Sequence, residues 1–139
     1  MYSIGEKVPN FERPANGGTQ IALSDFTGKY VVLYFYPRDN TSGCTTQSKG
    51  FSAAIQTLSD LNTVVLGVST DSVKSHDNFV SKQDLKTPLL SDEDNSLCEH
   101  FGVWTEKNMY GKKFMGIVRS TFLIDPDGVL IHEWRKVKV

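Results

Sequence analysis

The residue of this chain best suited to chemistry is Cys44, one of two cysteines among 139 residues. It stands among hydroxyl groups and a glycine, in TSGCTTQSKG (41–50), rather than among apolar side chains. Only the thiolate is a strong nucleophile, and the unpaired N–H groups and dipole of a helix N-terminus favour that anion. A cysteine in the first turn of a helix is therefore a candidate nucleophile.

Catalysis by a thiolate also needs groups that stabilise charge in the transition state. The hydroxyl of Thr41, three residues before Cys44, is one candidate donor, and Arg119 is the candidate cation. Arg119 opens the otherwise apolar run RSTFLID (119–125), and we expect parallel neighbours to bring the start of this strand to the edge of the site. Taken singly, these residues have ordinary alternatives as a structural cysteine, a turn or cap threonine, and a surface arginine.

A buried strand and a helix are predicted on either side of this motif. The strand is KYVVLYFYP (29–37), a near-continuous apolar run that Pro37 ends. The helix covers 42–61, because Phe51 and the apolar residues after it follow the helical period, and Cys44 lies seven residues before Phe51. The thiol thus belongs to the inward stripe of this helix. The later members of the stripe are Ala54, Ile55, Leu58 and Leu61.

The remaining pattern alternates between strands and helices. In chain order we expect a strand over 63–70, a helix over 71–84 capped by Asp71 or Ser72, an extended segment over 87–92 and a helix over 93–102 that Gly102 ends. The PDG turn (126–128) predicts a hairpin between RSTFLID and VLIHEWRK, and Gly17-Gly18 predict turns within a short strand pair. This order predicts an α/β, thioredoxin-like fold: a mixed central sheet flanked by helices on both faces, with Cys44 at the carboxyl end of a central strand.

Composition limits the class of protein. The length suits a single domain over residues 1–139, and the net charge of −1 gives no reason to expect a nucleic-acid partner. The sequence has no apolar run near the roughly 20 residues that span a bilayer and no signal-peptide pattern at its start, so no membrane partner is expected. Two cysteines 54 positions apart make no disulfide scaffold, which favours a cytoplasmic location.

Two other chemistries of cysteine fit poorly. A disulfide oxidoreductase would have a Cys-x-x-Cys motif, but Thr45, Thr46 and Gln47 follow Cys44. A metal site would need closely spaced ligands; Cys98 and His100 are two residues apart on a predicted helix and so point apart, and neither His76 nor His132 has a partner motif. We therefore expect neither a metal nor another cofactor.

The segment YFYPRDNTSGCTT (34–46) resembles the active-site motif of the peroxiredoxins, in which a proline, a threonine and the peroxidatic cysteine have fixed spacing. Further matching segments follow in family order: GVSTDSVKSH, PLLSDED, FGVW, KNMYGKKFMGIVRSTFLID and DGVL. The chain is most similar to the bacterioferritin-comigratory, or Q-type, peroxiredoxins, from about residue 3 to its end. The resemblance implies a thioredoxin fold, reduction of hydrogen peroxide and organic hydroperoxides, and a role in antioxidant defence and redox homeostasis.

The resemblance also implies a role for each matching residue. Cys44 would be the peroxidatic nucleophile, Thr41 would hydrogen-bond the thiolate and the peroxide, and Arg119 would hold the thiolate and polarise the O–O bond. Pro37 would shield the pocket from water, and the N–H groups of Gly43 and Cys44 would meet the peroxide oxygen. The expected reductant is thioredoxin, glutaredoxin or a small thiol, and the expected state is a monomer. The alternative function is a non-catalytic thioredoxin-fold module for binding or redox sensing.

Several positions depart from the family pattern. Ser42 replaces the usual proline, and its hydroxyl is able to cap the helix. Gln47 replaces the usual glutamate, which loses a favourable interaction with the helix dipole but takes an anion away from the thiolate. The positions of the two known resolving cysteines hold Lys49 and Val80, so Cys98 is the remaining second thiol.

Two hypotheses for Cys98 follow. In the first, Cys98 packs as a small apolar residue and an outside thiol reduces the oxidised Cys44. In the second, Gly50 eases local unwinding of the helix, and Cys98 reaches Cys44 to form a disulfide that thioredoxin reduces. The sequence also stops at Val139, where the family normally continues into a C-terminal helix. We expect an uncovered apolar sheet face there, with lower stability or self-association.

Overall fold

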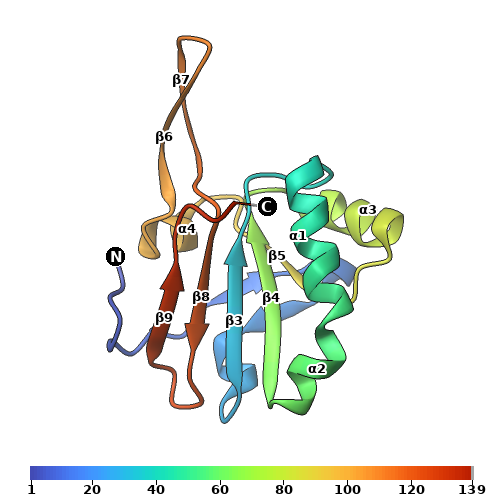
Figure 1. Ribbon diagram of the computed structural model, residues 1–139, viewed down its shortest axis with the longest axis vertical. Coiled ribbons are helices and arrows are strands. Elements are labelled where there is room, and N and C mark those ends of the chain that lie inside the picture. Colours follow the sequence, from blue (N-terminus) through green and yellow to red (C-terminus); the bar gives the residue numbers. More distant parts are fainter. Residues whose placement is uncertain (139) are drawn as a thin grey trace.

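Figure 1 shows the computed structural model of the chain, which describes residues 1–138. Val139, beyond which the family's C-terminal helix is expected to be missing, lies outside the described residues. The strands are β1 (Glu12–Pro14), β2 (Gln20–Ala22), β3 (Tyr30–Phe35), β4 (Thr63–Ser69), β5 (Leu89–Ser91), β6 (Trp104–Met109), β7 (Lys112–Ile117), β8 (Ser120–Ile124) and β9 (Leu130–Trp134). The helices are η1 (Asn16–Gly18), η2 (Leu23–Phe26), α1 (Ser42–Ala53), α2 (Ile55–Asp60), α3 (Val73–Gln83) and α4 (Ser96–His100).

A five-stranded mixed sheet forms the centre of the fold, in the strand order β5-β4-β3-β8-β9. β3, β4 and β5 are parallel, whereas β8 is antiparallel to both β3 and β9. The predicted mixed sheet and the β8–β9 hairpin are therefore confirmed. The short β1–β2 pair around Gly17-Gly18 is also present, and both glycines have the positive φ that these turns need.

β3 is buried on both faces of the sheet, as its apolar composition predicts. Leu33 and Phe35 belong to one core, together with Leu97 of α4. Tyr34 points to the opposite face and belongs to a second core, together with Phe79 of α3 and side chains of α1 and α2. Helices thus cover both faces of the sheet, which confirms the predicted thioredoxin-like layering. Within residues 1–138, no helix is both long and apolar enough to cross a bilayer.

Two elements differ from the prediction. The single helix expected over 42–61 is two helices, because Ala54 has ψ near 0°, outside the helical range. Leu61, predicted to be the last residue of the buried apolar stripe, is 64% exposed. The β6–β7 hairpin was not predicted, and Figure 1 shows it projecting away from the sheet. Its turn, Tyr110-Gly111, has positive φ at both residues, and a tyrosine there is a weak turn signal.

Candidate active site

Cys44 lies in the first turn of α1, with its side chain fully buried. The first intrahelical bond of α1 runs from the Thr45 N–H to the Thr41 carbonyl at 2.8 Å. The N–H groups of Gly43 and Cys44 precede that bond and have no acceptor within the helix. The end of the helix thus presents donors and a positive dipole on the same side as the thiol, as the sequence predicts.

Arg119 contacts the thiol directly. Its Nη2 donates to the Cys44 sulfur at 3.1 Å, and its Nη1 donates to the Gln47 Oε1 at 2.6 Å. Gln47 lies one turn after Cys44 on α1, so one helix supplies both acceptors for the guanidinium. A hydrogen bond from a cation favours the thiolate over the thiol. The sequence indicates Arg119 as a candidate cation. It gives no sign that the Gln47 side chain is the second acceptor of the guanidinium.

The strand direction that brings Arg119 to Cys44 is the reverse of the one expected. β8 is antiparallel to β3, with Ser120 paired with Phe35, so the start of β8 lies beside the end of β3. Arg119 immediately precedes β8, and Cys44 follows β3 after a short connection. In a parallel pair the start of β8 would lie at the opposite edge of the sheet. The expectation of parallel neighbours was therefore wrong, although the expected contact exists.

Thr41 and Pro37 occupy the connection between β3 and α1. Thr41 is the residue before α1, and its exposed hydroxyl donates to the Arg38 carbonyl at 3.0 Å. The only proton of this hydroxyl is therefore not directed at the Cys44 sulfur, in contrast to the role that the family resemblance implies. Pro37 is half-buried and comes two residues after the end of β3. Its role as a shield stays a prediction.

A network below Cys44 fixes the inner face of α1. Ser48, one turn after Cys44, is fully buried, and its hydroxyl lies 3.0 Å from the Tyr34 hydroxyl. The Tyr34 ring also stacks on Phe51 of α1, with centroids 4.6 Å apart. A Cβ at Gly67 of β4 would lie 2.7 Å from the Tyr34 ring, so this glycine leaves the space that the tyrosine occupies. One tyrosine of β3 thus contacts two side chains of the helix that carries the thiol.

A second cation lies within electrostatic range of the thiol. Burial lowers the pKa of the Lys107 ammonium on β6; the charge of Arg119 lowers it further, and that of Cys44 opposes both effects. Lys107 comes from the hairpin that sequence analysis missed, so no local signal pointed to it.

The environment of Cys98 agrees with a structural role. It is fully buried in the core that contains Leu33 and α4, on the other face of the sheet from Cys44. Burial raises its thiol pKa, and the charge of Asp92 raises it further. Its N–H donates to an oxygen of Asp92 at 2.8 Å. His100, two residues further on α4, is exposed whereas Cys98 is buried, as expected of side chains that point apart.

An apolar groove of about 690 Å³ lies over the sheet beside α1 and α2. Its apolar walls include Val32, Phe51, Ala54, Leu58 and Trp134. That this groove is a sheet face left uncovered by a missing C-terminal helix stays a prediction. The predicted effects on stability and association stay predictions.

His76, for which the sequence offers no metal-ligand motif, has a buried hydrogen-bond partner in the structure. His76 is fully buried on α3, and its Nδ1 lies 2.7 Å from an oxygen of Asp39. Asp39 follows β3 and His76 follows its parallel neighbour β4, so the carboxyl ends of adjacent strands bring them together. This topological relationship is the signal that could have identified the pair.

Comparison with known proteins gives consistent matches. Residues 4–133 match the AhpC/TSA family. The chain is 49% identical over 136 residues to peroxiredoxin Bcp of Bacillus subtilis, an alignment that covers 98% of this chain and 87% of that protein. The crystal structure of a cysteine-to-serine mutant of Xylella fastidiosa PrxQ matches with a TM-score of 0.95 and 45% identity, covering 100% of this chain and 89% of that one.

A third match concerns peroxide reduction. The bacterioferritin comigratory protein of Xanthomonas campestris was studied for alkyl peroxide reduction in trapped intermediate and ligand complexes. It matches with a TM-score of 0.88 and 50% identity, covering 93% of this chain and 82% of that one.

Proposed function

The chain belongs to the AhpC/TSA family, and we propose that Cys44 is the nucleophile with which it reduces peroxides. The protein is a peroxiredoxin, a thiol peroxidase that acts on peroxides with electrons from a thiol reductant. The observation that carries the assignment of Cys44 is the 3.1 Å hydrogen bond from Arg119 to its sulfur, at a helix N-terminus. This arrangement favours the reactive anion and argues against the alternative of a non-catalytic module.

The first step oxidises the sulfur. The Cys44 thiolate attacks the terminal oxygen of a hydroperoxide, forming an S–O bond and breaking the O–O bond. The attacked oxygen and its proton become the sulfenic acid of Cys44, which is oxidised by two electrons. The leaving alkoxide takes a proton from water and departs as an alcohol; with hydrogen peroxide it departs as water. Hydrogen peroxide and organic hydroperoxides are therefore both proposed substrates.

The surrounding groups stabilise this step in different ways. Arg119 holds the thiolate and polarises the O–O bond, and the N–H groups of Gly43 and Cys44 bind the peroxide oxygen as charge develops on it. The half-buried ring of Pro37 limits access of water to the pocket. With its proton on the Arg38 carbonyl, the Thr41 hydroxyl binds the peroxide by accepting from the peroxide O–H.

The second step uses a thiol from outside the chain. Such a thiol attacks the sulfenic sulfur, releases water and leaves a mixed disulfide, which another thiol then reduces. The burial of Cys98 on the other face of the sheet supports this route over a disulfide between Cys44 and Cys98. A small thiol, glutaredoxin or thioredoxin would serve as reductant. We also propose a monomer and a cytoplasmic location, where both free thiols would stay reduced.

One equivalent of hydrogen peroxide, followed by thiol blocking and intact-mass analysis, tests both parts of this proposal. We expect wild type and Cys98→Ser to gain one oxygen and Cys44→Ser to gain none. Loss of two hydrogens with both thiols blocked to alkylation would instead establish the disulfide route. In stopped flow, Cys44→Ser should lose the rapid reaction and Cys98→Ser should keep it. Equal rates for wild type and Cys44→Ser would end the peroxidase assignment of Cys44.

A further inference from the structure

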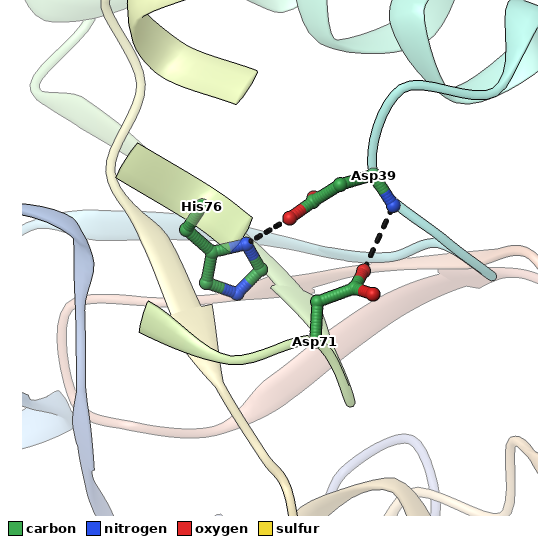
Figure 2. A group of neighbouring side chains, drawn as sticks. All are labelled: Asp39, Asp71 and His76. Atoms are coloured by element: carbon green, nitrogen blue, oxygen red, sulfur yellow. Dashed lines mark hydrogen bonds and ion pairs between the residues drawn. The ribbon is translucent and has the colours of Figure 1, made fainter. Parts of the chain in front are cut away.

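A buried polar cluster connects α3 to the segment that precedes α1. Figure 2 shows its three central side chains, with His76 directed at Asp39 and the Asp39 backbone directed at Asp71. The His76 Nδ1 lies 2.7 Å from the Asp39 Oδ2, and its Nε2 lies 2.9 Å from the Leu90 carbonyl oxygen. Both ring nitrogens therefore face an oxygen within hydrogen-bonding distance.

Each oxygen that faces a ring nitrogen of His76 acts towards the ring as an acceptor, not as a donor. The Leu90 carbonyl has no proton, and the Asp39 carboxylate already accepts from the hydroxyls of Tyr36 at 2.6 Å and Ser75 at 2.8 Å. The Tyr36 oxygen also lies 3.4 Å from Nδ1, but its proton is directed at Asp39. Burial, followed by the charge of Asp39, raises the Tyr36 pKa, so this hydroxyl keeps its proton at neutral pH. A neutral imidazole would leave one nitrogen lone pair facing an oxygen, whereas an imidazolium donates at both positions.

This pair holds the segment from Tyr36 to Thr41, which connects β3 to α1. The Asp39 side chain contacts α3 through His76 and Ser75, and its N–H donates to the Asp71 Oδ2 at 2.8 Å. Asp39 is thus fixed at both its side chain and its backbone, five residues before Cys44. The N–H groups of Gly43 and Cys44 follow directly from this segment, so their direction depends on it.

The same cluster does not fit a metal ion. Asp39, Asp71 and His76 offer ligand atoms within 4.8 Å of one another, which is close enough for a shared ion. However, both Asp39 oxygens and the Asp71 Oδ2 already accept hydrogen bonds from protein donors. In residues 1–138, every buried side-chain nitrogen and oxygen has a partner, so no unpaired ligand points to an ion.

We propose that His76 is a positioning residue of the peroxidase site: as an imidazolium it binds the Asp39 carboxylate and so fixes the segment that sets the direction of the Gly43 and Cys44 N–H groups. This role rests on the proposed function of Cys44. The charged and titratable groups facing His76 are Asp39 from the connection, Tyr36 from the end of β3 and Asp71 from the start of the α3 connection.

The first test uses the wild-type protein and so does not depend on a variant that folds. In ¹⁵N-histidine-labelled protein at neutral pH, we expect both ring nitrogens of His76 to show a directly bonded proton in reduced and peroxide-free samples. Comparison with His76→Gln assigns the signals. A His76 with one bare nitrogen would overturn the proposal.

The second test measures the reaction of Cys44 with hydrogen peroxide in single-turnover stopped flow. We expect His76→Gln and Asp39→Asn each to lower the second-order rate constant by up to about 100-fold, as misplacement of a reacting group by about 1 Å does. The double variant should be no slower than the slower single variant, because the two residues act as one unit. Unchanged rates in the folded single variants, or additive losses in the double variant, would overturn the proposal.

Phe79→Leu is the matched control, because Phe79 lies on α3 in the same core but outside the polar cluster. It should lower stability and leave the rate per folded molecule unchanged. An equal rate loss in Phe79→Leu would show that loss of packing alone explains the effect. Cys44→Ser separates failure of the proposed function from failure of the positioning role. If the peroxide reaction survives in Cys44→Ser, the proposed function fails. If the reaction depends on Cys44 but its rate is unchanged in His76→Gln, the positioning role fails.

Discussion

Removal of the Arg119 guanidinium should slow the reaction of Cys44 with peroxide. In Arg119→Met the side chain keeps its apolar stem but loses the 3.1 Å hydrogen bond to the Cys44 sulfur and the 2.6 Å bond to Gln47. The thiolate then depends on the helix N-terminus and on the more distant Lys107 ammonium, and the O–O bond loses the cation that would polarise it. The first oxidation step should therefore become slower without any change in which residue is oxidised.

The size of the effect follows from the hydrogen bond. A hydrogen bond to a charged group contributes about 1.5–3 kcal/mol, which corresponds to about 10- to 150-fold in rate. Arg119 is only half-buried, so solvent screening favours the lower part of this range, and we expect about a 10- to 50-fold loss. Gln47→Leu keeps the cation but removes its second acceptor, a neutral partner, and should cost about 5-fold.

The assay is single-turnover stopped flow with hydrogen peroxide, with rates expressed per reduced Cys44 thiol. Arg135→Met is the matched control, because Arg135 is another partly buried guanidinium, which pairs with Glu133 and the Phe101 carbonyl. This variant should react like wild type even where its stability falls. A folded Arg119→Met protein that reacts as fast as Arg135→Met would refute the role of the guanidinium.

Three further predictions concern stability. A Cβ at Gly67 would lie 2.7 Å from Tyr34, so Gly67→Ala should lower the free energy of unfolding by about 1–3 kcal/mol in urea titrations, and no change would contradict this packing. A Cβ at Gly50 meets nothing within 4 Å, so Gly50→Ala should add up to about 1 kcal/mol of helix stability; if α1 must unwind, it should also slow reduction of the sulfenic acid by an outside thiol. Burial, followed by the charge of Asp92, raises the Cys98 pKa. Above pH ~8.5 the unfolded chain therefore loses a proton that the folded chain keeps. The free energy of unfolding should then fall by up to about 1.4 kcal/mol per pH unit. Urea titrations between pH ~8.5 and ~10 in the Cys44→Ser background check this slope, which Cys98→Ala should reduce; identical slopes would contradict it.

The sequence by itself predicted most of the elements and a candidate nucleophile, because those signals are local. The continuous apolar run of β3, the turn between β8 and β9 and the cap of α3 at Ser72 depend on neighbours within a few residues. The place of Cys44 in the first turn of a helix is local in the same way. Arg119 could be suggested because it opens the otherwise apolar run RSTFLID, but its contact with the sulfur could not be derived.

Only the tertiary structure decided which distant residues meet. Cys44 and Arg119 are 75 positions apart, and they touch because β8 runs antiparallel to β3, a direction that no local pattern specifies. Asp39 and His76 meet for a similar reason, since adjacent parallel strands end at one edge of the sheet. The separation of Cys98 from Cys44 by the sheet also depends on which face each helix covers. Periodicity shows that a side chain is buried, whereas its neighbours are set by strand order and direction, which are properties of the whole chain.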